Sequence, residues 1–329
     1  MAKKFPTFDD CYSAMPKIKE PAKLYSFWEE EIIKIKKKPL EPVSKIKFKK
    51  TFARESFYEI QFRGHLDTII YGFLSIPRKF HKVPVVITLH DYWEEFKNLN
   101  AITHFLFSKG IAHLHLFLQD RQILEEKLKF QMDLKKKNEF LYPPLFLDIF
   151  KQPFSYDYGV FLILNVLRAI DFVRLNKSIR HDQIGILGRG LGCNLAIFAA
   201  FYKSESIKVL ALERPSLIWI ESFVKYSTSQ LSKEFQKIIQ LKKQKYKVSE
   251  VIEFYNDPIY LAGKVNIPMI MSIGLEDPLN PAYSAFGFFN LYRGEKSMQI
   301  FTEESLDPNQ EKERNTSLKF LTEYLIEKG

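Results

Sequence analysis

The chain has 329 residues, of which 46% are hydrophobic and 15% aromatic, so it can bury one large core, and we expect a single domain over residues 1–329. It holds only two cysteines, no apolar run behind the N-terminal lysines and no apolar segment of membrane-spanning length, which excludes a disulfide framework and a membrane protein and favours the cytoplasm. The lysines behind the formal charge of +10 are scattered and adjoin no recognition motif, so we interpret them as solvated helix faces and expect no nucleic-acid partner.

Residues 1–50 are expected to form an N-terminal helical extension. In the stretch "PAKLYSFWEEEIIKIKKK" the apolar residues recur at helical spacing, and "PLEPV" (39–43) ends this pattern. Alternating, β-rich sequence follows over 50–62 and 68–76, which predicts two antiparallel strands at the edge of a sheet.

Buried strands and helices alternate through the rest of the chain. Continuous apolar runs predict strands that are covered on both faces, and segments with helical spacing lie between them. The expected strands cover 83–90, 111–118, 183–188, 208–213, 268–274 and 298–301, and the expected helices cover 99–108 and 158–174 and begin near 192 and 281. This order predicts the α/β class, with a mostly parallel twisted sheet and helices on both faces. Residues 215–257 interrupt the order with amphipathic helical sequence, which we interpret as a helical insertion or lid.

The glycine-rich turn "LGRGLG" (187–192) lies between an expected strand and an expected helix, which is how esterases present a nucleophilic serine. The order of the elements resembles the α/β-hydrolase fold. In detail, the chain resembles the acetyl xylan esterase and cephalosporin C deacetylase family, carbohydrate esterase family seven, over nearly its whole length. The fragments that carry this resemblance are "FWEEEI", "PLEPV", "YGFLSIPR" and, as the most specific, "SIGLEDPLNPAYSAFGFFNLY".

The resemblance implies where a catalytic triad would lie. The nucleophilic serine falls on Gly190, the acid on Asp277 and the base histidine on Leu306, so that only the acid is present. In this fold the base follows the nucleophile and the acid along the chain, whereas all seven histidines of this sequence precede Gly190. We therefore expect that a serine-hydrolase mechanism is lost.

The resemblance also places the two oxyanion-hole N–H groups on Tyr92 and Leu191. In the loop "LHDYWEE" the tyrosine is present, but Asp91, Trp93 and Glu94 stand where the family has glycines, and carboxylates oppose the binding of an anion. The resemblance therefore implies an acetyl xylan esterase-like protein that is catalytically inactive and is retained to bind a small molecule or an acetylated sugar in the cleft, or a partner protein. Because the family forms ring-like homo-oligomers, it also implies self-association or mixed oligomers with an active relative. It implies no cofactor.

Two other functions fit parts of the sequence. An active ester hydrolase with relocated machinery would need another nucleophile, and Cys193 lies one helical turn beyond the elbow, although that place on a helix favours a packed thiol. A dinucleotide-binding protein would use Gly188, Gly190 and Cys193 as an approximate Gly-x-Gly-x-x-Gly fingerprint and Glu213 as the ribose-binding acid. The third glycine of that fingerprint is missing, and the motif lies in the middle of the chain.

Two further groups have both a functional and a structural interpretation. His113 and His115 share one face of an expected strand, a spacing that could bind a metal, but no further ligand pattern completes a site, so we favour packing or a polar network. Asp277 could serve as a turn carboxylate that accepts hydrogen bonds from the backbone amides of "EDPLNP".

Overall fold

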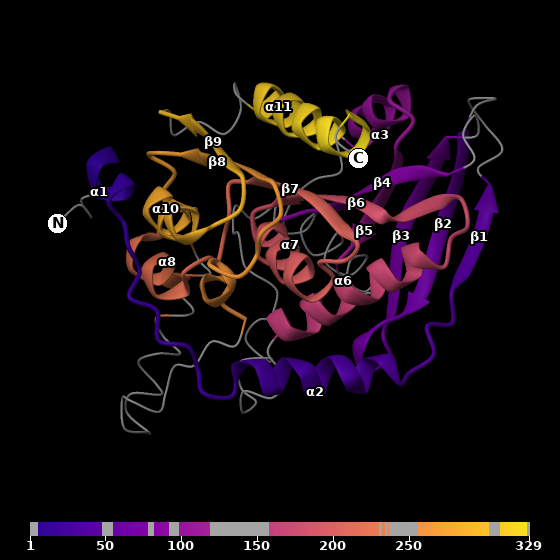
Figure 1. The fold of residues 1–329 in the computed structure, drawn as a ribbon, viewed down its shortest axis with the longest axis horizontal. Coiled ribbons are helices and arrows are strands. Elements are labelled where there is room, and N and C mark those ends of the chain that lie inside the picture. The colour runs from indigo at the N-terminus through magenta and orange to yellow at the C-terminus, as the bar shows by residue number, and fades with distance from the viewer. Residues whose placement is uncertain are drawn as a thin grey trace, which may run out of the picture.

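The structure, a computed structural model, describes residues 6–47, 55–77, 82–91, 99–118, 158–229, 232–233, 236, 256–302 and 310–327 (Figure 1). Among these residues no helix is long and apolar enough to cross a membrane.

The described residues form a nine-stranded sheet in the order β1-β2-β3-β5-β4-β6-β7-β8-β9. The pairs β1–β2, β2–β3 and β3–β5 are antiparallel, and every pair from β5 to β9 is parallel. The strands are β1 (Val43–Lys47), β2 (Glu55–Arg63), β3 (Ile69–Pro77), β4 (Val83–Leu89), β5 (Ala112–Phe117), β6 (Ile179–Arg189), β7 (Ile207–Glu213), β8 (Met269–Gly274) and β9 (Lys296–Phe301). This confirms the predicted α/β class, with its antiparallel edge and its parallel centre.

Helices cover both faces of the sheet. In Figure 1, α3 (Leu99–Ser108) and α11 (Gln310–Thr322) lie on one face, and α2 (Leu24–Lys36), α6 (Tyr158–Arg174), α7 (Leu191–Tyr202), α8 (Ile220–Tyr226) and α10 (Ala282–Leu291) lie on the other. The shorter elements are α1 (Phe8–Tyr12), which packs on α10, the 3-10 helices η1 (His65–Asp67) and η5 (Pro258–Leu261), and the π-helix η6 (Glu323–Glu327).

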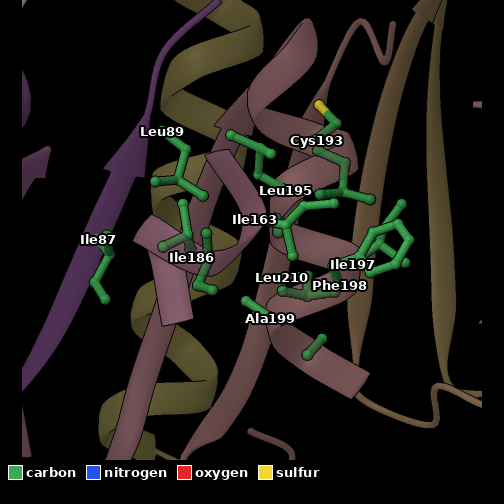
Figure 2. Close-up of a cluster of buried hydrophobic side chains, with 14 of the residues drawn as sticks. Ile87, Leu89, Ile163, Ile186, Cys193, Leu195, Ile197, Phe198, Ala199 and Leu210 are labelled. Carbon is green, nitrogen blue, oxygen red and sulfur yellow. The ribbon is translucent and has the colours of Figure 1, made fainter. Parts of the chain in front are cut away.

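The main core lies between the sheet and the helix α7. Figure 2 shows Ile87 and Leu89 of β4, Ile186 of β6 and Leu210 of β7 facing the side chains of α6 and α7. All ten residues from Leu191 to Ala200 are buried, so α7 is enclosed on every side. Because truncating a single large side chain in such a core costs about 2–5 kcal/mol, this packing holds the N-terminus of α7 in a fixed place.

Two polar side chains join the two ends of the segment 215–257. The side-chain amide of Asn194 donates to the carbonyl oxygens of Leu217 at 2.9 Å and of Asn256 at 3.1 Å. The carboxylate of Asp257 accepts from the backbone N–H groups of Trp219 at 3.0 Å and of Ile220 at 2.7 Å. The chain therefore leaves the core and returns to it at one place.

Two elements differ from the expectation. Val43–Lys47 forms the edge strand β1 inside the stretch that was expected to be helical, because its backbone pairs with β2. The C-terminal helix α11 was not predicted. Most of the predicted insertion lies outside the described residues, and within it the structure describes α8 and the residues beside it. The division into a helical extension and an insertion stays a prediction.

Candidate functional site

The turn between β6 and α7 has the geometry of a nucleophile elbow. Gly190 lies between strand and helix with φ 53° and ψ −117°, a backbone conformation that costs about 1–3 kcal/mol for a residue with a Cβ. Its N–H donates to the carbonyl oxygen of Glu213 at 3.0 Å, and its carbonyl oxygen accepts from the N–H of Ser216 at 3.1 Å. These two bonds tie the elbow to the end of β7.

The neighbouring glycines are explained by close backbone packing. A Cβ at Gly188 would overlap the backbone of Gly192, and a Cβ at Gly192 would overlap the backbone of Leu89. The Gly-x-Gly-x-x-Gly-like pattern is thus explained without a nucleotide, because close packing requires Gly188 and the positive φ favours glycine at position 190.

The carboxylate of Asp91 occupies the space where a side chain at position 190 would lie. A Cβ added to Gly190 would overlap both oxygens and the carboxyl carbon of Asp91. The backbone N–H of Leu191 donates to Asp91 Oδ1 at 3.0 Å, so the N–H group that was expected in the oxyanion hole already binds a carboxylate of the chain itself. Asp91 was expected to be an unfavourable charge at this place, but its contact with the elbow was not predicted from the sequence.

A histidine fixes the backbone of Asp91. His90 is 8% exposed, and its Nδ1 lies 2.5 Å from the carbonyl oxygen of Asp91. The N–H of Leu118 donates to His90 Nε2 at 3.4 Å. Because Nε2 accepts a hydrogen bond, we assign the ring proton to Nδ1, which then donates to Asp91. His90 thus holds in place the residue that fills the elbow.

Asp277 follows β8 and is engaged in the turn that it begins. Its Oδ1 accepts from the N–H groups of Leu279 at 2.8 Å and of Asn280 at 3.0 Å. Its Oδ2 lies 3.8 Å from Nη1 of Arg214, so that an arginine is its charged neighbour. The turn-carboxylate interpretation of Asp277 describes these contacts. Leu306 and Tyr92, at the expected positions of the base and of the second oxyanion-hole donor, lie outside the described residues.

A buried group of charged side chains lies beside Asp277, at the ends of β6 and β7 and on α11. Glu213 and Glu313 are fully buried and accept hydrogen bonds from Arg189 at 3.0 and 3.1 Å. Glu213 also accepts from Arg314 at 2.8–3.0 Å, and Glu313 from Arg214 Nε at 3.2 Å and from Ser272 at 2.6 Å. We call Arg189, Glu213, Arg214, Glu313 and Arg314 the charge cluster.

The arginines of the charge cluster keep the side chain of Glu213 ionised. Burial alone would raise the pKa of Glu213, but the guanidinium groups of Arg314 and Arg189 outweigh it and hold the pKa below its usual value. The carboxylate that a dinucleotide site would direct to the ribose is therefore ionised and engaged in ion pairs with two arginines.

Cys193 has the environment of a structural thiol. It is fully buried, and its Sγ donates to the carbonyl oxygen of Glu213 at 3.3 Å. Burial raises its pKa well above the usual value, with Glu213 and Asp91 adding to the effect. Since the thiolate is the nucleophilic form, these surroundings disfavour catalysis by Cys193.

The two histidines of β5 belong to a polar network on the face of the sheet that α3 covers. Thr88 Oγ1 lies 3.0 Å from His113 Nε2 and 2.8 Å from His115 Nδ1, and Thr103 Oγ1 lies 2.8 Å from His113 Nδ1. Burial lowers the pKa of His113 to about 3, with Arg314 adding to the effect, and lowers that of His115 well below its usual value. Within the described ranges no group of three or more His, Cys, Asp or Glu side chains could hold a metal ion.

Comparison with known proteins matches this chain to esterases over nearly its whole length. The model of the family "Acetyl xylan esterase (AXE1)" matches residues 5–324. The structure is similar to an acetyl xylan esterase from Paenibacillus sp. R4, with 20% identity and a TM-score of 0.80 over 97% of this chain and 100% of that one. It is also similar to acetyl xylan esterase 1 from Thermoanaerobacterium sp. JW/SL YS485, with 14% identity and a TM-score of 0.76 over 96% and 99% of the two chains.

A more distant neighbour shares the central part of the fold. A dienelactone hydrolase from Anabaena variabilis ATCC 29413 is 14% identical, with a TM-score of 0.52 over 83% of this chain and 99% of that one. Together with the strand order, these similarities confirm the α/β-hydrolase fold that the sequence was expected to adopt.

Proposed function

The chain belongs to the acetyl xylan esterase family, and from this premise we propose that it is a catalytically inactive member that is retained to bind a ligand or a partner protein. The contact between Asp91 and the elbow carries the proposal. In a serine hydrolase the residue at the elbow supplies the nucleophile, and the following N–H stabilises the oxyanion. Here Gly190 has no side chain, and the following N–H, that of Leu191, is bound by Asp91.

The acid supports the same conclusion. A triad aspartate accepts a hydrogen bond from the base and stabilises the charge that the base acquires. Asp277 instead accepts two backbone hydrogen bonds and lies 3.8 Å from a guanidinium nitrogen. A histidine base is missing from every position after Gly190 in the sequence. The retained aspartate thus has a structural use that does not require catalysis.

We infer that the fold is retained without ester hydrolysis, because a binding role needs the fold and does not need the nucleophile. The elbow is held by the buried helix α7 and by the backbone bonds of Gly190, and neither depends on a nucleophile. We include in this proposal a small molecule or an acetylated sugar as the ligand, and a second copy of the chain or an active relative as the partner. Size-exclusion chromatography with light scattering tests the self-association, and a monomer at micromolar concentration contradicts that part.

Hydrolysis of 4-nitrophenyl acetate by the purified protein tests the proposal. We expect the wild type to show only the background rate, and we expect an Asp277→Ala variant to match it. The competing function, an active ester hydrolase with relocated machinery, predicts turnover well above background that is lost in Asp277→Ala. That result would overturn the proposal.

Variants that restore the triad residues test whether Asp91 at the elbow prevents ester hydrolysis. Gly190→Ser with Leu306→His restores the two missing triad residues, and adding Asp91→Gly clears the space at the elbow. If the fold is still competent, the triple variant gains esterase activity and the double variant does not. Activity in the double variant would contradict the role assigned to Asp91.

A further inference from the structure

Trp219 precedes the helix α8 in a backbone conformation that disfavours large side chains. Its φ is 50° and its ψ is 68°, in the left-handed region where a bulky residue is a rare exception. Such strain persists only where the surroundings impose it, and it gathers at functional sites. Here the carboxylate of Asp257 imposes it, because it accepts from the N–H groups of Trp219 and Ile220.

The helix α10 is shaped to receive the Trp219 ring. A Cβ added to Gly287 would lie 2.4 Å from Cε3 and 2.6 Å from Cζ3 of Trp219, so glycine lets the ring lie against this helix. Tyr283, one turn earlier on α10, stacks on the same ring, with 5.3 Å between the ring centres and 29° between the planes. The backbone of Trp219 and two positions of α10 therefore fix the place of this ring.

A third ring joins this group from the end of α8. The ring of Tyr226 lies 5.1 Å from that of Tyr283, at an interplanar angle of 53°. Trp219, Tyr226 and Tyr283 are each half-buried, whereas Trp28 of α2 is fully buried. The strained backbone thus holds a ring that the core does not enclose. We call Trp219, Tyr226 and Tyr283 the aromatic patch.

The charged residues beside the aromatic patch offset each other. The ammonium group of Lys225 lies 4.8 Å from the centre of the Tyr226 ring. Glu221 is four residues earlier on α8, so the two opposite charges are neighbours on the helix surface, and both residues are exposed. They offer a hydrogen-bond donor and an acceptor to hydroxyl groups, but together they favour neither an anion nor a cation.

We propose that the aromatic patch binds a neutral sugar, with one face of the pyranose ring against the aromatic rings. The face of an aromatic ring is negative, so it attracts the weakly positive C–H groups on the face of a pyranose whose hydroxyl groups are equatorial. Those hydroxyl groups project from the edge of the sugar ring, where Glu221 and Lys225 bind them. An ionised sugar would lose hydration without gaining an unpaired opposite charge.

This inference deepens the proposed binding function and rests on it, because it assigns a ligand to a surface formed by α8, α10 and the residue before α8. The two can fail separately. The proposed function fails if the wild type hydrolyses esters. The sugar site fails if sugars do not bind through the aromatic patch, whatever the esterase assay shows.

Titration of the purified protein with methyl β-D-glucopyranoside, followed by saturation-transfer NMR, tests the site. Tyr283→Leu keeps an apolar side chain but removes the ring, and we expect it to weaken binding at least about fivefold. Tyr283→Phe keeps the ring and removes only the hydroxyl group, and it should bind within about twofold of the wild type. Tyr71→Leu, at a half-buried tyrosine of β3, is the matched control and should bind as the wild type does.

The charge of the ligand is tested with methyl β-D-glucuronide, which differs from the first probe only by a carboxylate at C6. At constant ionic strength it should bind at least about fivefold more weakly. If the circular dichroism spectrum shows that Tyr283→Leu does not fold, Tyr226→Leu takes its place with the same expected loss. This keeps the comparison between a ring and an aliphatic side chain.

Four results would each overturn the proposal. The first is no saturable binding of the glucoside to the wild type at millimolar concentration. The second is equal binding by Tyr283→Leu and the wild type, which would place the sugar elsewhere, such as at the elbow. The third is an equal loss in Tyr283→Phe and Tyr283→Leu, and the fourth is binding of the glucuronide as tight as that of the glucoside.

Discussion

The carboxylate of Asp91 lies against the backbone of Gly190, in the space that a side chain at position 190 would fill. Asp91 fits because residue 190 has no side chain, and the N–H of Leu191 binds the carboxylate at 3.0 Å. The space that a side chain at position 190 would fill thus holds a carboxylate that belongs to the chain. Under the proposed function, restoring a nucleophile at position 190 would therefore need more than a single substitution.

Gly190→Ser should therefore destabilise the protein and restore no esterase activity. The new Cβ would overlap Asp91, and the backbone conformation costs about 1–3 kcal/mol for a residue with a side chain. Urea unfolding of Gly190→Ser, Asp91→Gly and the double variant measures this. The double variant should be less unstable than the sum of the two single changes, and strict additivity would show that the two residues do not compete for space.

Asp91 should contribute to stability as a cap of α7. Its carboxylate accepts from the N–H of Leu191, which is one of the donors that the first turn of a helix leaves free. We expect Asp91→Ala to lower the free energy of unfolding by about 1 kcal/mol, and Asp91→Asn, which keeps an acceptor oxygen, to lower it by less. Chemical denaturation of the two variants gives the answer. A loss in Asp91→Asn equal to that in Asp91→Ala would contradict the capping role.

His113 should make the protein less stable as the pH falls below about 6.5. Burial lowers its pKa from 6.5 to about 3, so between these values the unfolded chain binds a proton that the folded protein does not. The stability that His113 contributes is therefore present above pH 6.5 and is lost as the pH falls toward 3. Its share of the slope approaches about 1.4 kcal/mol per pH unit.

The measurement is the difference between the wild type and His113→Gln in the free energy of unfolding from pH 7 to pH 5. The variant should lose less stability over this range than the wild type does. His104→Gln, at an exposed histidine on α3, is the control for replacing a histidine by glutamine. If His113→Gln also keeps the full pH dependence, the network of Thr88 and Thr103 does not hold His113 in the neutral form.

Asp257 should have the opposite effect, because its contribution to the free energy of unfolding increases as the pH falls. Burial raises its pKa from 3.8 to about 7, although three backbone N–H groups act to lower it. The folded protein then binds a proton that the unfolded chain lacks, so this contribution is complete below pH 3.8 and is lost as the pH rises through 7. Asp257→Asn removes it, and the stability of this variant should fall more steeply than that of the wild type between pH 7 and pH 5.

The sheet and the elbow were predictable because their patterns are local. The run "VPVVITLH" gives β4, and the glycines of "LGRGLG" give the turn, since both depend on neighbouring residues. The strand β1 was missed because its lysine-rich sequence carries little β signal, and α11 was missed because its sequence, "QEKERNTSLKFLT", is largely polar. Backbone pairing and packing on β7 decide these two elements.

The contacts of the site depend on residues that are far apart in the sequence. Asp91 and Leu191 are 100 positions apart, and Arg214 and Glu313 are 99 apart, so no local pattern connects them. One signal could have indicated the first contact. Asp91 lies two residues after the end of β4, and β4 pairs in parallel with β6, which places the ends of both strands at one edge of the sheet.

Asn194 and Asp257 hold the two ends of the segment 215–257 together, and this affects how the length of the segment can evolve. Closing a longer loop costs little once its ends are held together, about 0.6 kcal/mol for each doubling of its length. The free energy of closing the segment 215–257 therefore depends only weakly on the number of residues that it contains. Relatives of this chain should differ in length there more than anywhere along β6 and α7, where each glycine is confined by its neighbours.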